Sequence, residues 1–206
     1  MSLQKFNKQD VQIVETDRVY NGFFKVDKLY VKHKLFSGGW TGEIAREIFE
    51  RGHAVAMLPY DPVRDEIVLI EQFRVGALDT VATPWLLEII AGMIDEGEEP
   101  DDVCRREAME EAGLTVGKLV KIMQYLPSPG GMTESIHLYI GAVDATNAGG
   151  IHGLESENED IRVHRLPRLK VLQMLKAGKF DNSAIIIALQ WFALNFDDIK
   201  KQLLDE

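Results

Sequence analysis

Three glutamates stand close together in residues 106–113, which read REAMEEAG. Glu107, Glu110 and Glu111 are spaced i, i+3 and i+4, so in a helix they project from one face. Like charges at these spacings destabilise a helix by about 0.2–0.5 kcal/mol per pair. Such a face is either a solvated surface or a surface that binds positive charge. Because Mg²⁺ takes carboxylate oxygens as ligands, the second reading points to metal-dependent chemistry.

A pyrophosphate is a substrate that this face would suit. Both of its phosphoryl groups carry negative charge, which repels an attacking water, and divalent cations neutralise that charge. Residues 92–105, which precede REAMEEAG, read GMIDEGEEPDDVCR. Two of them, Gly92 and Glu98, support this reading. Arg106 can pair with Glu98 in the preceding loop, and Gly92 permits a backbone geometry that a side chain would obstruct.

Residues 92–114 resemble the Nudix box, the signature of hydrolases that cleave a nucleoside diphosphate linked to another moiety. All of its fixed-identity positions match, which chance would produce at roughly 10⁻⁸ per start position. Leu114 fills an apolar position of the box, while Ala108 stands where a larger aliphatic residue is usual. The matching residues are Gly92, Glu98, Arg106, Glu107, Glu110, Glu111 and Gly113.

The resemblance implies a site for divalent metal ions. Glu107 and Glu111 would bind metal and take part in catalysis, and Glu110 and the carbonyl oxygen of Ala91 would be further ligands. About two or three Mg²⁺ ions are expected, with Mn²⁺ able to replace them.

A second acidic cluster lies in residues 153–164, which read GLESENEDIRVH. From composition alone it is an ordinary acidic loop ahead of a strand. If the box glutamates are all metal ligands, however, the general base that activates water must come from elsewhere. In the Nudix enzymes that the chain resembles, a loop after the box supplies this base. Position in the sequence assigns Glu157 as the base and Glu159 as a further metal ligand, with the other acids of the loop as alternatives.

Pro129 indicates the substrate class, since it lies 129 − 114 = 15 residues beyond Leu114. A proline at this distance is typical of the Nudix subgroup that hydrolyses ADP-ribose to AMP and ribose 5-phosphate. A Pro-Gly turn between strands would also explain it. Longer stretches resemble the same subgroup, among them YNGFFKVD, LIEQFRVGA and PWLLEIIAGMID. The alternatives are a Nudix hydrolase of another nucleotide sugar, such as GDP-mannose, and a non-catalytic nucleotide-binding sensor on the same fold.

The resemblance also implies a homodimer whose N-terminal sheets help to complete the substrate pockets. Phe23 would stack on adenine, and Arg46 and Arg74 would contact adenine or phosphates. Glu134 would touch the substrate. Each has a plainer reading: a core aromatic for Phe23, surface ion pairs for the arginines, and a strand-edge acid for Glu134.

Composition limits the other partners of the chain. Its 33 acidic and 23 basic residues leave a net charge of −10, and without a basic patch this argues against nucleic-acid binding. No signal peptide is recognisable and the apolar stretch at 184–194 is too short for a bilayer, so we expect a cytoplasmic protein without membrane contact. The single cysteine, Cys104, is expected to be a buried thiol, and the five histidines lack zinc-ligand spacing.

The hydrophobic pattern predicts the elements that position these residues. Residues 11–20 and 23–36 favour strands, with a turn at 37–39, and a second hairpin is predicted where HAVAMLPYD and EIVLIEQFRV flank PVRDE. WLLEIIAGMI, SIHLYIGAVD and IRVHRL also favour strands. A helix is predicted from Pro100 to just before Gly113, a short helix at 168–179, and one long helix at 182–204.

This order predicts an α+β fold, in which a Nudix-type mixed sheet lies between helices and a small antiparallel sheet precedes it. We expect a domain boundary at residue 51. Residues 1–51 would then form an N-terminal antiparallel region for dimerisation and the substrate pocket, and residues 52–206 would form the hydrolase domain.

Overall fold

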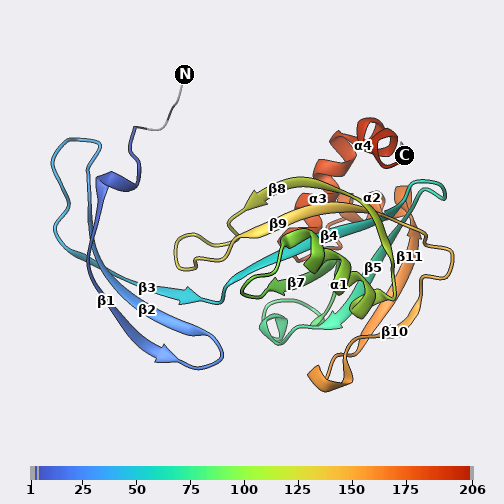
Figure 1. Cartoon of the computed structure of the whole chain (residues 1–206), viewed down its shortest axis with the longest axis horizontal. Coiled ribbons are helices and arrows are strands. Elements are labelled where there is room, and N and C mark those ends of the chain that lie inside the picture. Colours follow the sequence, from blue (N-terminus) through green and yellow to red (C-terminus); the bar gives the residue numbers. More distant parts are fainter. Residues whose placement is uncertain (1–2, 4, 205–206) are drawn as a thin grey trace. The chain divides into compact units, whose positions relative to one another are not determined.

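The computed structural model describes Leu3 and residues 5–204 (Figure 1). These residues form eleven strands and four α-helices, together with three short 3-10 helices. Their contacts divide the chain into two compact units. One unit is Met1–Gly52 with Leu126–Glu134, and the other is His53–Tyr125 with Ser135–Glu206.

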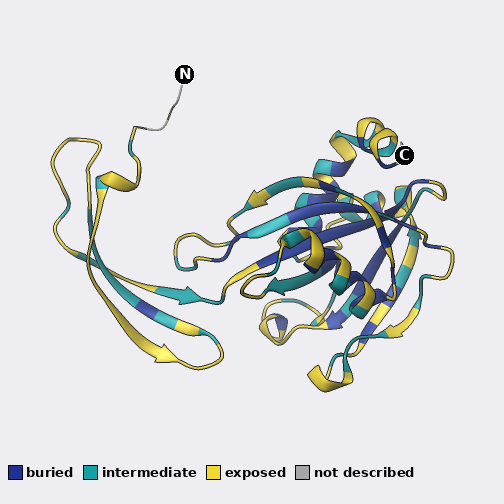
Figure 2. Cartoon of the chain, in the orientation of Figure 1, coloured by how far each residue is buried: buried dark blue, intermediate teal, exposed yellow. Residues whose placement is uncertain are grey.

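The first unit contains a three-stranded antiparallel sheet in the order β1-β2-β3. The predicted turn at 37–39 joins β2 to β3, where Gly38 and Gly39 have φ values of 98° and 76°. β1 is exposed along its whole length, and neither apolar core of the described residues includes a residue of this unit (Figure 2). A sheet without a buried face is weakly stable by itself. Its strands are β1 (Val11–Asn21), β2 (Lys25–His33) and β3 (Ile44–Glu50).

The second unit is built on a mixed sheet in the order β10-β11-β5-β4-β9-β8, with β6 paired to β5 and β7 paired to β4. β4 and β9 run parallel, and the other neighbouring strands run antiparallel. The strands are β4 (His53–Asp61), β5 (Glu66–Phe73), β6 (Trp85–Glu88), β7 (Ile90–Ile94), β8 (Val116–Tyr125), β9 (Ile136–Val143), β10 (Gly150–His152) and β11 (Ile161–Pro167). The helices are α1 (Pro100–Ala112), α2 (Arg168–Lys176), α3 (Ser183–Leu194) and α4 (Phe196–Leu204).

Helices cover both faces of this sheet, and side chains alternate along β4 between two apolar cores (Figures 1 and 2). Val55 and Met57 pack into the core that includes α1. Leu58 and Tyr60 pack into the core that includes α2, α3 and α4. A strand that is buried on both faces reads as a continuous apolar run, as HAVAMLPY does. The prediction of an α+β fold with a mixed sheet between helices is confirmed.

The prediction of one long C-terminal helix is wrong, because Asn195 separates α3 from α4. Asn195 has φ −122° and ψ 20°, and its Nδ2 donates a hydrogen bond to the carbonyl oxygen of Trp191 at 2.8 Å. A side chain that binds the last carbonyl groups in this way helps to end a helix. The break places the ring of Phe196 at 6.2 Å from that of Tyr60 and at 5.5 Å from that of Phe192.

The run WLLEIIAGMI forms two strands where the sequence pattern predicts one. β6 pairs with β5, and after Ile89 the chain pairs with β4 as β7. The sequence pattern also misses β8, which pairs with β9. In the part of the chain that the structure describes, no helix is both long and apolar enough to cross a membrane.

Candidate active site

α1 carries the three glutamates, and it begins and ends where the sequence predicts. Pro100 is at the first helical position, where its missing N–H costs nothing. Asp101 and Asp102 lie in the first turn, near the positive end of the helix dipole. Gly113 ends the helix in the left-handed conformation, with φ 63° and ψ 27°. The helix packs against β7, which positions its glutamates beside that strand.

The three glutamates differ in burial and in what they contact. Glu111 is 3% exposed, and the side chains of Glu107 and Glu110 are 14% and 27% exposed. Glu111 Oε2 accepts a hydrogen bond from the backbone N–H of Ala91 at 3.0 Å. Glu107 lies against Gly92, where a Cβ atom would come within 1.9 Å of Glu107 Oε1. Gly92 is therefore needed because a carboxylate occupies the space that a side chain would fill.

Arg106 joins the loop before α1 to the glutamate face. Its guanidinium donates to the two carboxylate oxygens of Glu98 at 3.2 and 3.3 Å, which confirms the predicted pair. It also donates to Glu107 at 2.7 Å and to Glu110 at 3.2 Å. Arg106 thus relieves part of the repulsion that the sequence pattern assigned to bound cations alone. The N–H of Asp95 and the Arg106 guanidinium together hold the pKa of Glu98 below its usual value.

Burial is the main influence on the ionisation of the two inner glutamates. It raises the pKa of Glu107 to about 7 and that of Glu111 to about 8. Arg106 opposes the rise at Glu107, and the N–H of Ala91 opposes it at Glu111. Carboxyl groups that ionise reluctantly are stabilised in their charged form by a nearby cation. The face therefore favours a positively charged ligand.

A divalent cation fits the chemistry of this donor set, which consists of carboxylate and carbonyl oxygens. Within the described residues, however, no group of three or more His, Cys, Asp or Glu side chains converges to form a metal site. Arg106 donates to one oxygen of Glu107 and one of Glu110, and the N–H of Ala91 donates to one oxygen of Glu111. Each carboxylate has a second oxygen that can accept a cation.

The second acidic cluster lies close to this helix. It follows β10 and leads into β11, and both strands pack on α1. The N–H of Gly153 donates to the carbonyl oxygen of Glu110 at 3.1 Å, which ties the start of the loop to the last turn of α1. Gly153 has φ 103°, and a Cβ atom there would lie 2.7 Å from the Cβ of Glu159.

The two acids to which the sequence assigns roles are placed differently within this loop. Oε2 of Glu159 accepts a hydrogen bond from the N–H of Leu154 at 3.1 Å. The charge of Glu159 is also a minor contribution to the raised pKa values of Glu107 and Glu111. Glu157 is exposed at the end of a 3-10 helix, Glu155–Glu157. Their roles as base and ligand stay predictions.

Arg74 belongs to the same unit as the glutamates. It follows β5, and its guanidinium contacts Glu88 of β6 through Nε at 2.9 Å and Nη2 at 2.8 Å. Its positive charge is among the groups that oppose the rise in the pKa of Glu111. Arg74 therefore lies near the buried end of the glutamate face.

The other predicted substrate residues belong to the first unit. Phe23 is 84% exposed between β1 and β2, with its ring 4.7 Å from that of Phe24. Arg46 is exposed on β3 and donates to the carbonyl oxygen of Ala45. Glu134 is buried and pairs with Arg51 at 3.4 Å, and Arg51 lies over the ring of Phe24 at 5.5 Å. Phe23 and Glu134 are thus linked through Phe24 and Arg51.

The sequence pattern misses a buried carboxylate, Glu88, which contacts Arg74. Glu88 is the one charged residue in the apolar run WLLEIIAGMI. A charge within a run that is otherwise buried needs partners, so this position carried a signal for a specific contact.

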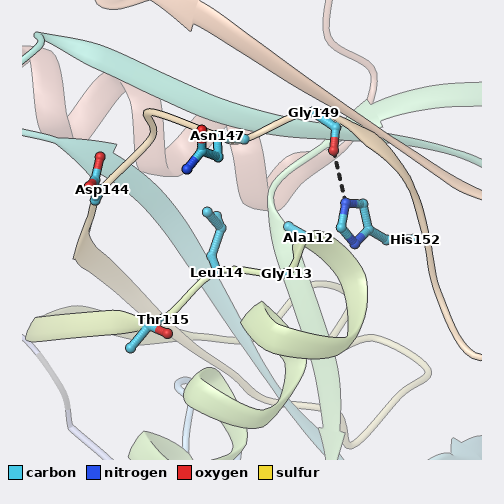
Figure 3. A pocket seen from close by; sticks show the side chains of 9 residues that line it. Ala112, Gly113, Leu114, Thr115, Asp144, Asn147, Gly149 and His152 are labelled. Atoms are coloured by element: carbon cyan, nitrogen blue, oxygen red, sulfur yellow. Dashed lines mark hydrogen bonds between the residues drawn. The ribbon is translucent and has the colours of Figure 1, made fainter.

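A cavity of about 290 Å³ lies at the C-terminal end of α1 (Figure 3). There His152 Nε2 is 2.9 Å from the carbonyl oxygen of Gly149. The lining residues are Ala112, Gly113, Leu114, Thr115, Asp144, Asn147, Ala148, Gly149 and His152. This set does not overlap with the predicted metal or substrate residues.

Comparison with known proteins adds a family and named relatives. A model of the NUDIX domain matches residues 50–188. The chain is 53% identical to an ADP-ribose pyrophosphatase of Escherichia coli strain K12, over 96% of this chain and 94% of the relative. It is 36% identical to a GDP-mannose pyrophosphatase of Shigella flexneri serotype 5b, over 73% of this chain and 78% of the relative. A crystal structure of an ADP compounds hydrolase shares the fold, with a TM-score of 0.71 at 20% identity, covering 97% of this chain and 98% of that one.

Proposed function

This chain belongs to the Nudix family, and from that premise we propose that it hydrolyses the pyrophosphate bond of ADP-ribose, giving AMP and ribose 5-phosphate. The observation that carries the proposal is the 53% identity to an ADP-ribose pyrophosphatase over 96% of the chain. The glutamate face of α1 gives this similarity a chemical basis, because it presents buried carboxylates that favour a cation.

The proposed reaction depends on Mg²⁺, with about two or three ions and with Mn²⁺ able to replace them. Glu107, Glu110, Glu111 and Glu159 would hold the ions together with the carbonyl oxygen of Ala91. Bound cations of this kind neutralise the diphosphate and stabilise charge that develops on it during hydrolysis.

Glu157 is proposed as the general base, which takes a proton from the attacking water. Its exposed position on a short 3-10 helix leaves the carboxylate able to approach a substrate. The tie between Gly153 and the carbonyl oxygen of Glu110 supports this role, since it keeps the loop beside α1. A positioned general base contributes about 10²–10⁴ in rate.

Four side chains are proposed to bind the rest of the substrate. Phe23 offers an exposed ring on which adenine can stack, and Arg46 and Arg74 offer guanidinium groups to adenine or to the phosphates. Glu134 would accept hydrogen bonds from the substrate. The support for Arg74 is its place near Glu111.

We further propose that the enzyme is a cytoplasmic homodimer, with residues 1–51 as the dimerisation region. The support is the first unit, which exposes apolar side chains such as Ile13 and Val19 on β1 and Phe23 in the turn after it. Light scattering is expected to give about twice the 23.2 kDa of one chain. A mass equal to one chain at micromolar concentration would contradict the dimer.

A substrate panel tests the proposed activity. The full chain is incubated with Mg²⁺ and ADP-ribose, ADP-glucose, GDP-mannose, NADH or diadenosine polyphosphates, and the products are separated by chromatography. We expect the highest kcat/KM with ADP-ribose. The Shigella relative makes GDP-mannose the second candidate, and a higher kcat/KM with it would overturn the substrate proposal. Binding without hydrolysis of any compound would favour a sensor.

A further inference from the structure

Glu88 is a buried carboxylate with an unusually complete set of donors. It is 3% exposed, and its Oε2 lies 2.9 Å from Nε of Arg74, 2.8 Å from Nη2 of Arg74 and 3.3 Å from Nε2 of Gln72. Its other oxygen, Oε1, accepts a hydrogen bond from Nδ2 of Asn182 at 2.8 Å. A buried charge is tolerated when it is paired in this way. These hydrogen bonds also restrict the side chains of the donors, Arg74 among them, to one orientation.

Asn182 connects Glu88 to a helix. It is the N-cap of α3, where its Oδ1 accepts a hydrogen bond from the N–H of Ala184 at 2.8 Å. Asn, Asp and Ser cap helices about equally well. Only Asn among them has an amide donor in addition to its acceptor, and an Asp would place a second negative charge beside Glu88. The identity of this cap is therefore explained by its contact with Glu88.

Arg74 is the group that this arrangement orients. Its backbone N–H donates to the carbonyl oxygen of Pro84 at 2.8 Å, and two of its side-chain nitrogens contact one oxygen of Glu88. The side chain is still 43% exposed, and Nη1 makes no hydrogen bond within the described part of the chain. One edge of the guanidinium is held, while another edge is available to an anionic ligand.

A guanidinium that is held before the ligand arrives binds a phosphate more tightly than a mobile one. An arginine side chain that becomes ordered on binding loses rotamer freedom, and this loss weakens binding. Here the buried carboxylate has already ordered Arg74, and the helix cap has ordered the carboxylate.

We propose that Glu88 and Asn182 are positioning residues, which hold the Arg74 guanidinium so that it binds the diphosphate of the substrate. This inference rests on the proposed function, since it specifies how the proposed site binds its substrate. Neither residue needs to touch the substrate or the reacting atoms.

Steady-state kinetics with ADP-ribose test the proposal. Glu88→Gln keeps the shape of the side chain but loses its charge, and we expect KM to rise about tenfold while kcat changes less than threefold. Arg74→Ala is expected to raise KM at least as much. In the double variant, Glu88→Gln should add little to Arg74→Ala, because Glu88 acts through Arg74. Independent effects that multiply in the double variant would overturn the proposal.

Asn182→Asp provides a second variant if Glu88→Gln does not fold. It keeps the cap of α3 but exchanges a donor for a charge beside Glu88, so KM should rise about threefold or more with an intact helix. Asp65→Asn is the matched control, because it also removes a paired carboxylate, which contacts Nε of Arg168 at 2.6 Å. This pair is not part of the glutamate face. It should lower the thermal midpoint without changing KM. An unchanged KM in Asn182→Asp would overturn the proposal.

Calorimetric titration with ADP, a diphosphate that needs no turnover, separates this inference from the proposed function. If wild type hydrolyses no substrate of the panel, the proposed function fails, and the affinity for ADP still tests the positioning. Weaker binding of ADP by Glu88→Gln, by about the same factor as the rise in KM, supports it. Equal affinities in wild type and variant would overturn it.

Discussion

At the scale of residues, the glutamates of α1 are arranged by burial as much as by spacing. Glu111 is the most buried and is held by the N–H of Ala91, whereas Glu110 is more exposed and is held by Arg106. Glu107 lies between them in burial and packs on Gly92. The inner pair carries the raised pKa values, so these two carboxylates gain most from a cation.

Gly92→Ala should disrupt the site without disrupting the fold. The added Cβ would lie 1.9 Å from Glu107 Oε1 and 2.4 Å from its Cγ, so the glutamate side chain must move. We expect kcat/KM to fall at least tenfold, since small displacements of positioned groups reduce rates strongly. Circular dichroism should show a native fold. Gly130→Ala is the control, because a Cβ there meets nothing within 4 Å. A Gly92→Ala enzyme of normal activity would show that Glu107 can move freely.

Glu157→Gln should lower kcat by at least tenfold to a hundredfold, the scale of a lost general base. Glu157 lies outside α1, so the affinity for Mg²⁺ and the thermal midpoint should stay near the wild-type values. Glu155→Gln is the matched control on the same 3-10 helix. A large loss of activity in Glu155→Gln with none in Glu157→Gln would show that Glu155, and not Glu157, is the general base.

At the scale of elements, the sequence predicted what depends on local pattern. α1 was predictable because Pro100 and Gly113 mark its ends, and the β4–β5 hairpin because two apolar runs flank a Pro-containing turn. The split of WLLEIIAGMI into β6 and β7 was not, because partner choice depends on tertiary contacts with β5 and β4. The contacts of Arg106 with Glu107 and Glu110 could not be predicted either, because they depend on side-chain directions.

Asp61 is the last residue of β4, and its carboxylate binds backbone N–H groups of the β4–β5 turn and of Ala145. Its replacement tests how much these hydrogen bonds contribute to stability. It is buried and accepts hydrogen bonds from the N–H groups of Val63, Arg64 and Ala145, each at 2.9 Å. Burial alone would raise its pKa, but these donors and the Arg64 guanidinium outweigh burial and lower it below 3.8. Asp61→Asn should reduce the free energy of unfolding by about 1–3 kcal/mol at pH 7.

The pH dependence of this effect has a defined sign. A carboxyl group whose pKa is lowered by folding stabilises the native state above its unfolded pKa, about 3.9, and loses that contribution as pH falls through the folded value. The difference between wild type and Asp61→Asn should therefore be constant from pH 7 to about 5 and shrink below about 4. Urea unfolding at each pH measures it. Asp144→Asn, which alters an exposed partner of Arg64, should leave the free energy of unfolding nearly unchanged. A difference that grows on acidification would contradict the assignment.

At the scale of the whole molecule, an acidic chain is proposed to bind an anionic substrate. The net charge of −10 would repel a diphosphate, so positive charge must be supplied locally. Arg106 and Arg74 supply some of it, but both are already paired with carboxylates. The remaining balance is left to bound cations, so we expect the second unit to need a divalent metal for its function.

This dependence predicts that Mg²⁺ stabilises the folded chain. A ligand that binds the native state at a hundred times its Kd adds about 2.7 kcal/mol, which for a chain of this size raises the thermal midpoint by about 5–10 °C. Scanning fluorimetry with Mg²⁺ and then with excess EDTA should show the rise and its reversal. Glu111→Gln removes the most buried carboxylate of α1, so the shift should fall by more than half. Asp198→Asn on α4, across the sheet from α1, should retain it. An equal shift in Glu111→Gln would mean that Mg²⁺ binds the chain away from the glutamate face.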